Sequence, residues 1–239
     1  MTSSSVLAMA LLCSGCQAQI SDDLGANVSG ADAGPNGDAA ACASRSVYLS
    51  FEGQTLTRGR SDATTNLAEW MQIDQGTAPP YLAGIANRAA TIQAIVDGVR
   101  AQLAQVPVTV VTTRPASGSY MMIVYGGRAA AVGSRFGAAV NRLDCDDSRP
   151  SDVAWVSDSV SPVQRVVNTT LGAIGFGLGL TATTDPGDCM CGWDNACSSD
   201  NTVACQLGSP IQRDPAANQL CPGVTSQDEL ATLRAAFCR

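Results

Sequence analysis

The apolar residues of the first two thirds of the chain predict short strands and one long helix. Between residues 84 and 105, apolar residues recur every three or four positions, as on one face of an amphipathic helix, and Pro107 ends the pattern. Residues 54–80 carry Gly, Thr, Pro and Asp without such periodicity and are predicted to form a long loop. The helix stripe consists of Ile85, Ala89, Ile92, Val96, Val99 and Leu103. Short runs rich in β-branched and aromatic residues predict strands at 47–51, 108–112, 120–125 and 152–156.

The last third of the chain changes character. Residues 163–180 are apolar and rich in glycine, and residues 185–224 form a cysteine-rich region with little periodicity. The spacing of Ser226 and Glu229 is typical of a capping box and predicts a final helix. Its buried stripe would be Leu230, Leu233 and Phe237, with Cys238 pinning its end. The whole pattern predicts one α+β domain over 42–239, with two long helices on a mixed sheet and a disulfide-rich C-terminal part.

The N-terminal residues predict export. The apolar run at 6–12 is too short to span a bilayer, which takes about 20 residues, and is typical of a signal peptide over 1–15. Small residues before Cys16 resemble the lipobox of bacterial lipoproteins, which implies cleavage before Cys16 and attachment of a lipid to its thiol. The alternative is ordinary cleavage near Ala18 or Ala39. Residues 16–41 are acidic and poor in apolar side chains, so we expect the anchor to be followed by a flexible tether. The prediction is a secreted protein of the cell envelope that meets the membrane only through its lipid.

Eight further cysteines follow the anchor. An even number of cysteines in an exported chain predicts four disulfides, whose pairing the sequence leaves open. The alternative is a zinc site with four cysteine ligands in the C-x-C-x5-C-x7-C stretch, although this spacing lacks the usual close pairs. The eight candidates are Cys42, Cys145, Cys189, Cys191, Cys197, Cys205, Cys221 and Cys238.

Composition excludes several functions. The 239 residues include no histidine and no lysine, and 14 arginines against 21 acids leave a net charge of −7. Histidine-dependent catalytic units, imidazole zinc sites and histidine pH switches are therefore excluded. The acidic balance argues against a nucleic-acid partner. Charged residues make up 15% of the chain, below the average of about 25%, so uncharged polar residues must cover much of its surface.

Residues 172–182 carry a resemblance to a known family. They resemble the active-site helix of the metzincin zinc metalloproteases, H-E-x-x-H-x-x-G-x-x-H, which is followed by a turn containing methionine. Gly179 matches the glycine at which that helix turns, and Met190 matches the methionine of the turn. The resemblance extends over about residues 45–192 and implies a metzincin-like fold. The alternative is an unrelated apolar segment.

The chemical positions of this motif are all replaced. Gly172, Phe176 and Ala182 stand where the family has its three histidines, and Ala173 stands where it has its catalytic glutamate. These side chains offer no nitrogen, carboxylate or thiolate to a metal. The resemblance therefore implies a member without zinc, without a cofactor and without enzymatic activity.

Acidic clusters are the remaining candidates for binding. Their oxygens could hold Ca²⁺, although solvated turn acids are the commoner explanation. Trp193, in the cysteine-rich region, could be an exposed contact. The acids are Asp144, Asp146 and Asp147 around Cys145, and Asp185 and Asp188 around a Pro-Gly turn.

Three functions remain as expectations. The first is an inactive metalloprotease-like envelope protein that binds a peptide or protein by strand addition without cleaving it. The alternative is a structural or accessory surface lipoprotein with no cleft, and a hydrolase with a non-histidine site is a third. An open groove beside residues 120–125 and Phe176 would favour binding. A groove filled by side chains or by the cysteine-rich loop would favour the structural role.

Overall fold

A computed structural model describes residues 45–193, 197, 202–208, 210–216, 220–223 and 225–238, which all belong to one unit of the chain. The predicted signal peptide, Cys16, the tether and Cys42 lie outside the described residues. The α+β class is confirmed, with four helices and three sheets among the elements described. The helices are α1 (Arg88–Gln102), α2 (Ala129–Val132), α3 (Val163–Gly177) and α4 (Glu229–Phe237). The strands are β1 (Ser46–Ser50), β2 (Gln54–Arg58), β3 (Leu67–Ala68), β4 (Gln75–Ala78), β5 (Thr109–Val111), β6 (Tyr120–Tyr125), β7 (Ala139–Val140), β8 (Val153–Val156), β9 (Ile211–Gln212) and β10 (Ser226–Gln227).

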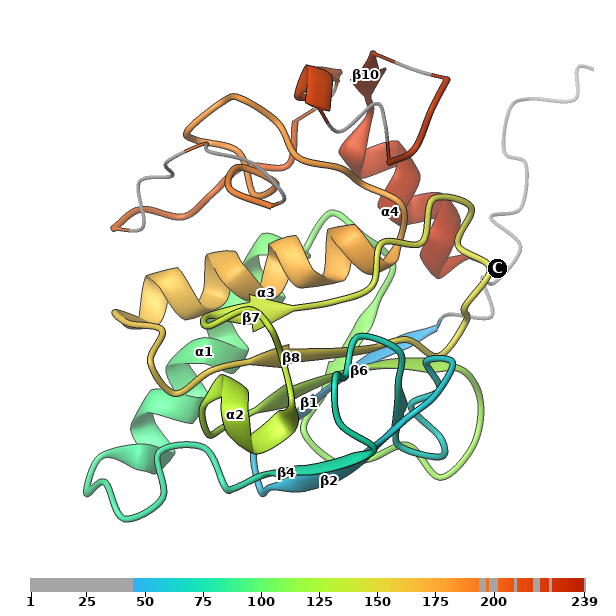
Figure 1. Ribbon diagram of the computed structural model, residues 1–239. Coiled ribbons are helices and arrows are strands. Elements are labelled where there is room, and N and C mark those ends of the chain that lie inside the picture. The colour runs from blue at the N-terminus through green and yellow to red at the C-terminus, as the bar shows by residue number, and fades with distance from the viewer. Residues whose placement is uncertain are drawn as a thin grey trace, which may run out of the picture. The chain divides into compact units, whose positions relative to one another are not determined.

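The main sheet has five strands in the order β5-β1-β6-β8-β7 (Figure 1). β1 runs parallel to β5 and β6, β6 runs parallel to β8, and β7 pairs antiparallel with β8. The predicted strands at 47–51, 108–112, 120–125 and 152–156 correspond to β1, β5, β6 and β8. The edge strands of this sheet, β5 and β7, are both short.

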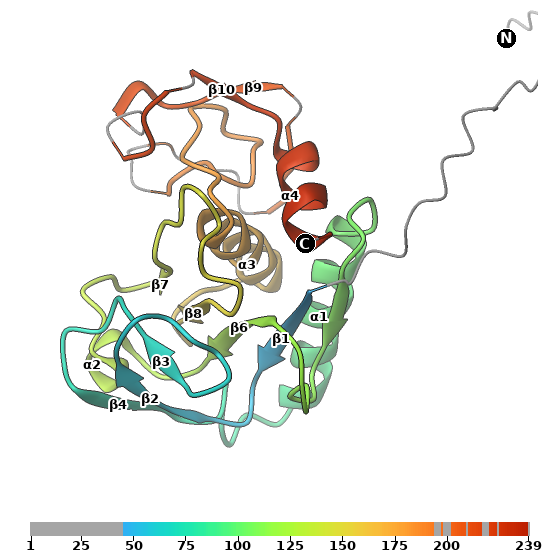
Figure 2. The same cartoon turned by 90° about the vertical axis from the view of Figure 1, so that its right-hand side faces the viewer.

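Both faces of this sheet are covered, which explains why all six residues of β6 are apolar and buried. Met121, Ile123 and Tyr125 belong to the core cluster shared with α1 and α3. The alternate residues Met122 and Val124 belong to a second cluster, shared with the β3-β2-β4 sheet and α2. Figures 1 and 2 show the resulting layers, with α1 and α3 on one face and β2 and β4 on the other.

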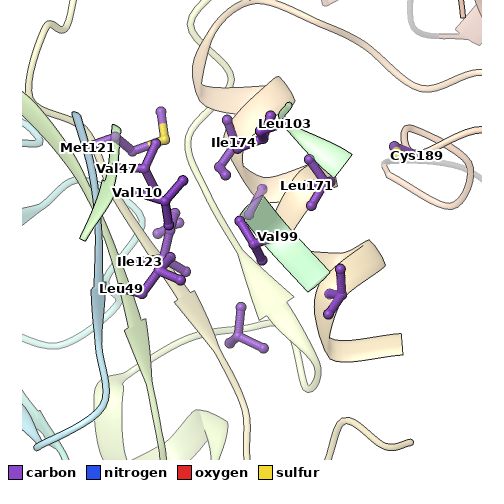
Figure 3. Packing of buried hydrophobic residues seen from close by; sticks show 14 of the residues in the cluster. Val47, Leu49, Val99, Leu103, Val110, Met121, Ile123, Leu171, Ile174 and Cys189 are labelled. Atoms are coloured by element: carbon purple, nitrogen blue, oxygen red, sulfur yellow. The ribbon is translucent and has the colours of Figure 1, made fainter. Parts of the chain in front are cut away.

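The helix-side core is well packed. Figure 3 shows Val47, Leu49 and Ile123 of the sheet directed toward Val99 of α1 and Leu171 of α3. Each of these five side chains is at most 1% exposed. Burying a side chain of this size stabilises the fold by about 1.5–3 kcal/mol relative to leaving it in water.

The predicted loop over residues 54–80 is the largest error of the sequence analysis. It contains the small sheet β3-β2-β4, in which β2 pairs antiparallel with β4. Only one or two small or medium-sized residues of each strand are buried, such as Leu56 and Ala78. An apolar pattern this sparse lies below what sequence periodicity detects.

Other boundaries also differ from the prediction. α1 begins at Arg88, so Ile85 lies outside the helix and is 51% exposed. The capping box is wrong, because Ser226 lies in β10 and the side chain of Asp228 caps α4 by accepting a hydrogen bond from the Ala231 N–H. Leu233 and Phe237 are buried as predicted, and Leu230 is partly buried against them.

The described cysteines form disulfides, which confirms the prediction of a disulfide-rich domain. The pairs are Cys145–Cys221, Cys189–Cys205 and Cys191–Cys197, and Cys238 is disulfide-bonded as well. The alternative zinc site is wrong, because its four cysteines pair with one another. Disulfides indicate an oxidising environment, as outside the cytoplasm. Across the described ranges, no helix has both the length and the apolar character needed to cross a bilayer.

Candidate functional site

Helix α3 carries most of the positions that resemble the metalloprotease motif. It packs between the main sheet and the C-terminal part of the chain, which is coloured orange to red in Figure 1. The helix ends at Gly177, and the N–H groups of Leu178 and Leu180 both donate to the carbonyl of Gly175. Gly179 has a φ of +89°, in the left-handed region that favours glycine. The chain therefore turns sharply at the predicted glycine and brings Ala182 back into the core.

Gly172 and Phe176 lie four residues apart and share one face of α3. Trp193 packs against this face, and its Nε1 lies 1.9 Å from where a Cβ on Gly172 would be. The rings of Phe176 and Trp193 lie 5.3 Å apart between centroids, in a tilted arrangement. Phe176 is 6% exposed, and Ala173 and Ala182 are at most 1% exposed. An indole thus fills the space that a side chain at position 172 would need.

Met190 fills the next part of the same surface. It is fully buried, and its Sδ lies 2.6 Å from where a Cβ on Gly175 would be. The Trp193 N–H donates to the Met190 carbonyl. Disulfides of Cys189 and Cys191 hold both sides of Met190. Gly172 and Gly175 are therefore explained by close approach of this segment, since each leaves room for one of its side chains.

The arrangement offers no ligands at the four motif positions. Gly172, Ala173, Phe176 and Ala182 supply only backbone and hydrocarbon, and the group that packs on Gly172 and Phe176 is an indole. Within the part of the chain that the structure describes, no group of three or more histidine, cysteine, aspartate or glutamate side chains is placed to hold a metal ion.

The acids around Cys145 are used in ion pairs and turns. Asp144 accepts hydrogen bonds from the Ser148 hydroxyl and the Arg149 N–H, and it pairs with the Arg149 guanidinium at 2.9 Å. Asp147 pairs with the buried Arg45 at 2.8 Å. Asp146 is exposed. The carboxylates of Asp144 and Asp147 therefore already have cationic partners.

The two acids of the Pro-Gly turn have different environments. Asp185 is exposed and accepts a hydrogen bond from the Gly187 N–H, as a turn acid does. Asp188 is 3% exposed and faces Glu229 of α4, which is fully buried. Burial raises the pKa of Glu229 to about 9, and the charge of Asp188 acts in the same direction. Burial also raises the pKa of Asp188.

Asp152 is another buried acid, beside the end of α3. Asp152 is 1% exposed, and burial raises its pKa to about 7. Its Oδ1 accepts the Val153 N–H, and its Oδ2 is buried. The Oδ2 atom lies 2.7 Å from where a Cβ on Gly177 would be. Asp152 is therefore enclosed beside the end of α3.

The roles of Glu229 and Trp193 differ from those that the sequence predicts. A usable signal existed for Glu229, since it lies four positions before Leu233 and seven before Ala236 and so shares their buried face. No comparable signal existed for Trp193. Its region lacks periodicity, so its packing on Phe176 instead of an exposed position could not be predicted.

Substitution of Gly172 by alanine is expected to displace Trp193 with little change in stability. The new Cβ would overlap the indole, while alanine improves helix propensity by about 1 kcal/mol. This gain offsets the lost aromatic packing, which is worth about 0.5–1.5 kcal/mol. Tryptophan emission should shift to the red and become more sensitive to acrylamide, because the displaced Trp193 is more exposed to water. Trp70 and Trp155 stay buried, so the change reports on Trp193.

Gly98→Ala on α1 is the matched control. It adds the same methyl group to a helix at a position facing Val167, and it should leave the emission unchanged. An unaltered spectrum in folded Gly172→Ala protein would contradict the close packing of Trp193.

Comparison with known proteins adds no assignment to this site. No family model matches the chain, and no curated protein matches it.

Proposed function

We propose that this chain is a catalytically inactive, metzincin-like protein of the cell envelope that serves as a structural or accessory module. The observation that carries the proposal is the indole of Trp193 on Gly172, which fills the surface where the related enzymes hold zinc. Support for the family relationship comes from the buried helix α3, the left-handed turn at Gly179 and the packing of Met190 beneath Gly175. The proposal includes export and a lipid anchor at Cys16.

The environment of α3 favours the structural role over peptide binding. β6 lies inside the sheet between β1 and β8, so it has no open edge. The edge strands β5 and β7 have three and two residues. In β5, the guanidinium of Arg100 donates to the carbonyl of Val110, which occupies part of the edge. Short, covered edges are poor templates for strand addition.

A hollow of about 410 Å³ does exist elsewhere on the surface. Residues of α1, β5 and the segment between them line it, including Arg100, Leu103 and Val108, and no residue of α3 contributes. Its location gives no reason to connect it with the motif positions.

The direct test is a joint assay of zinc content and proteolysis on the purified protein. We expect less than stoichiometric zinc and no cleavage that a chelator abolishes, because the four motif positions carry no ligand atoms. Stoichiometric, tightly held zinc or chelator-sensitive cleavage would contradict the proposal.

Restoring the motif tests the family relationship separately. Combined Gly172→His, Ala173→Glu, Phe176→His and Ala182→His substitutions should not create a zinc site alone, because Trp193 occupies the space of the first imidazole. Adding Trp193→Gly should allow zinc to bind, since imidazoles at i and i+4 share one helix face and the third follows the turn.

The control for this restoration lacks one ligand. It carries Gly172→Ala in place of Gly172→His and keeps the other four substitutions, so it should bind zinc much more weakly. Isothermal titration with zinc would separate the variants. A folded five-substitution variant that gains no zinc binding would argue against the proposed alignment.

A further inference from the structure

The methionine turn and helix α4 meet through a pair of buried carboxyl groups. Asp188 lies two residues before Met190, and Glu229 is the first residue of α4. The two side chains lie within hydrogen-bonding distance of each other and are 3% and 0% exposed. Two ionised carboxylates in such contact repel one another strongly, so a pair of this kind retains one proton.

The hydrogen bonds around the pair show where that proton belongs. Asp188 Oδ1 accepts the Met190 N–H at 2.8 Å and the Thr183 hydroxyl at 2.9 Å. Glu229 Oε2 accepts the Gly208 N–H at 2.9 Å, and its Oε1 accepts the Gln227 amide at 2.8 Å. Asp188 Oδ2 is buried, and no described N–H or hydroxyl donates to it. A proton on Glu229 satisfies this remaining oxygen.

The charged groups nearby do not remove the need for the proton. Among the described residues, the segments that carry or pack against the pair also hold Asp185, Arg213, Asp214, Asp228 and Arg234. Arg234 donates to the carbonyl of Gln105. The Nε of Arg213 donates to Thr181, and hydrogen bonds continue from Thr181 through Gln227 to Glu229. The N-terminus of α4 favours an anion at Glu229, but burial beside a second carboxylate outweighs that preference.

We propose that Asp188 and Glu229 share one proton as a latch that holds the methionine turn to α4, and that loss of this proton in alkaline solution releases the turn. Two negative charges would then lie in a buried contact, and separation of the two segments would relieve them. The Met190 N–H donates a hydrogen bond to Asp188, and the backbone N–H of Trp193 donates to the Met190 carbonyl. Release of the turn therefore also loosens the packing of the Trp193 indole on α3. This latch is independent of whether the chain descends from a metalloprotease.

The sign of the pH dependence follows from the direction of the shift. The pKa of Glu229 is raised from 4.5 to about 9 in the folded state, so folding retains a proton that the unfolded chain releases above about pH 4.5. The contribution of protonated Glu229 to the free energy of unfolding is therefore fully present below about pH 4.5. It is lost as the pH rises toward 9. Asp152, with a pKa raised to about 7, contributes in the same direction.

The first experiment observes the proton directly. The chain contains only three glutamates, Glu52, Glu69 and Glu229, so carboxyl-¹³C-labelled glutamate gives three resonances. We expect one of them to belong to a carboxyl group that is protonated at pH 7, and this resonance should disappear in Glu229→Gln protein. A spectrum in which no glutamate carboxyl is protonated at pH 7 would overturn the proposal.

The second experiment removes the proton requirement while keeping the contact. In Asp188→Asn protein, the new amide can donate to Glu229 while its oxygen still accepts from Met190 and Thr183. The wild-type melting temperature should fall by on the order of 10 °C between pH 5 and pH 9. The variant should fall by much less and melt above the wild type at pH 9. Equal slopes would overturn the proposal.

A matched control and a local reporter complete the test. Glu52→Gln changes an exposed glutamate and should keep the wild-type slope. With 5-fluorotryptophan in place of the three tryptophans, the ¹⁹F signal of Trp193 should shift between pH 7 and pH 10, while those of Trp70 and Trp155 stay in place. A Trp193 signal that does not move in wild-type protein would overturn release of the turn. If Asp188→Asn protein fails to fold, the titration of wild-type protein still decides the matter.

Discussion

Replacement of Gly126 by alanine is expected to lower the free energy of unfolding by about 3 kcal/mol or more. Gly126 follows β6 with a φ of +125°, a conformation that costs non-glycine residues about 1–3 kcal/mol. An added Cβ would also lie 2.1 Å from the carbonyl oxygen of Pro79, so the backbone itself must shift. Overpacking of this kind costs about 1–3 kcal/mol more. Urea unfolding of the wild type and the variant measures the difference.

The matched control separates the clash from the backbone strain. Gly118 also has a positive φ, of +83°, but a Cβ there would meet nothing within 4 Å. Gly118→Ala should therefore cost only about 1–2 kcal/mol, from the left-handed conformation alone. Equal losses in the two variants would show that the approach of Pro79 contributes nothing.

Removal of the Cys145–Cys221 disulfide should have the second large effect, a loss of about 4–5 kcal/mol. This bridge joins residues 76 positions apart and connects the loop after β7 to the C-terminal part. A cross-link over a long loop removes more conformational entropy from the unfolded chain than one over a short loop. Denaturant unfolding of Cys145→Ala/Cys221→Ala protein under non-reducing conditions measures the loss.

The Cys191–Cys197 bridge provides the comparison. It joins residues six positions apart, so its removal should cost only about 2–2.5 kcal/mol. A larger loss from Cys191→Ala/Cys197→Ala than from the long-range pair would contradict the entropic explanation. It would indicate that the short bridge acts mainly by holding Trp193 and Met190 against α3.

Much of the main sheet and its helices could be predicted from the sequence. β6 is apolar at every position because both of its faces are covered, and the predicted stripe of α1 includes the buried Val96 and Val99, while the buried Ile95 was not part of it. These features depend on local periodicity, which a single sequence displays. The strands of the small β3-β2-β4 sheet show no such periodic apolar pattern. They bury little apolar surface and depend on the neighbouring main sheet for their position.

Some features of the candidate site could likewise be predicted from the sequence, and others could not. The glycine-rich segment and the sharp turn at Gly179 could be located from the sequence. The reason for the glycines within α3 could not be predicted, because the side chains that approach them, those of Trp193, Met190, Asn141 and Asp152, are distant in sequence or outside any periodic element. The spacing assigns Glu229 to a capping box, because its partner, Asp188, lies 41 residues earlier in a turn and is invisible to local patterns.

The sequence by itself determined the absence of histidine chemistry, the α+β class and the oxidising environment. These follow from composition and from patterns within single elements. Only the tertiary structure decided that an indole and a thioether fill the surface of α3, and that two acids meet in the core. Such contacts join segments with no shared periodicity, and their energies depend on burial, which exists only once the chain has folded.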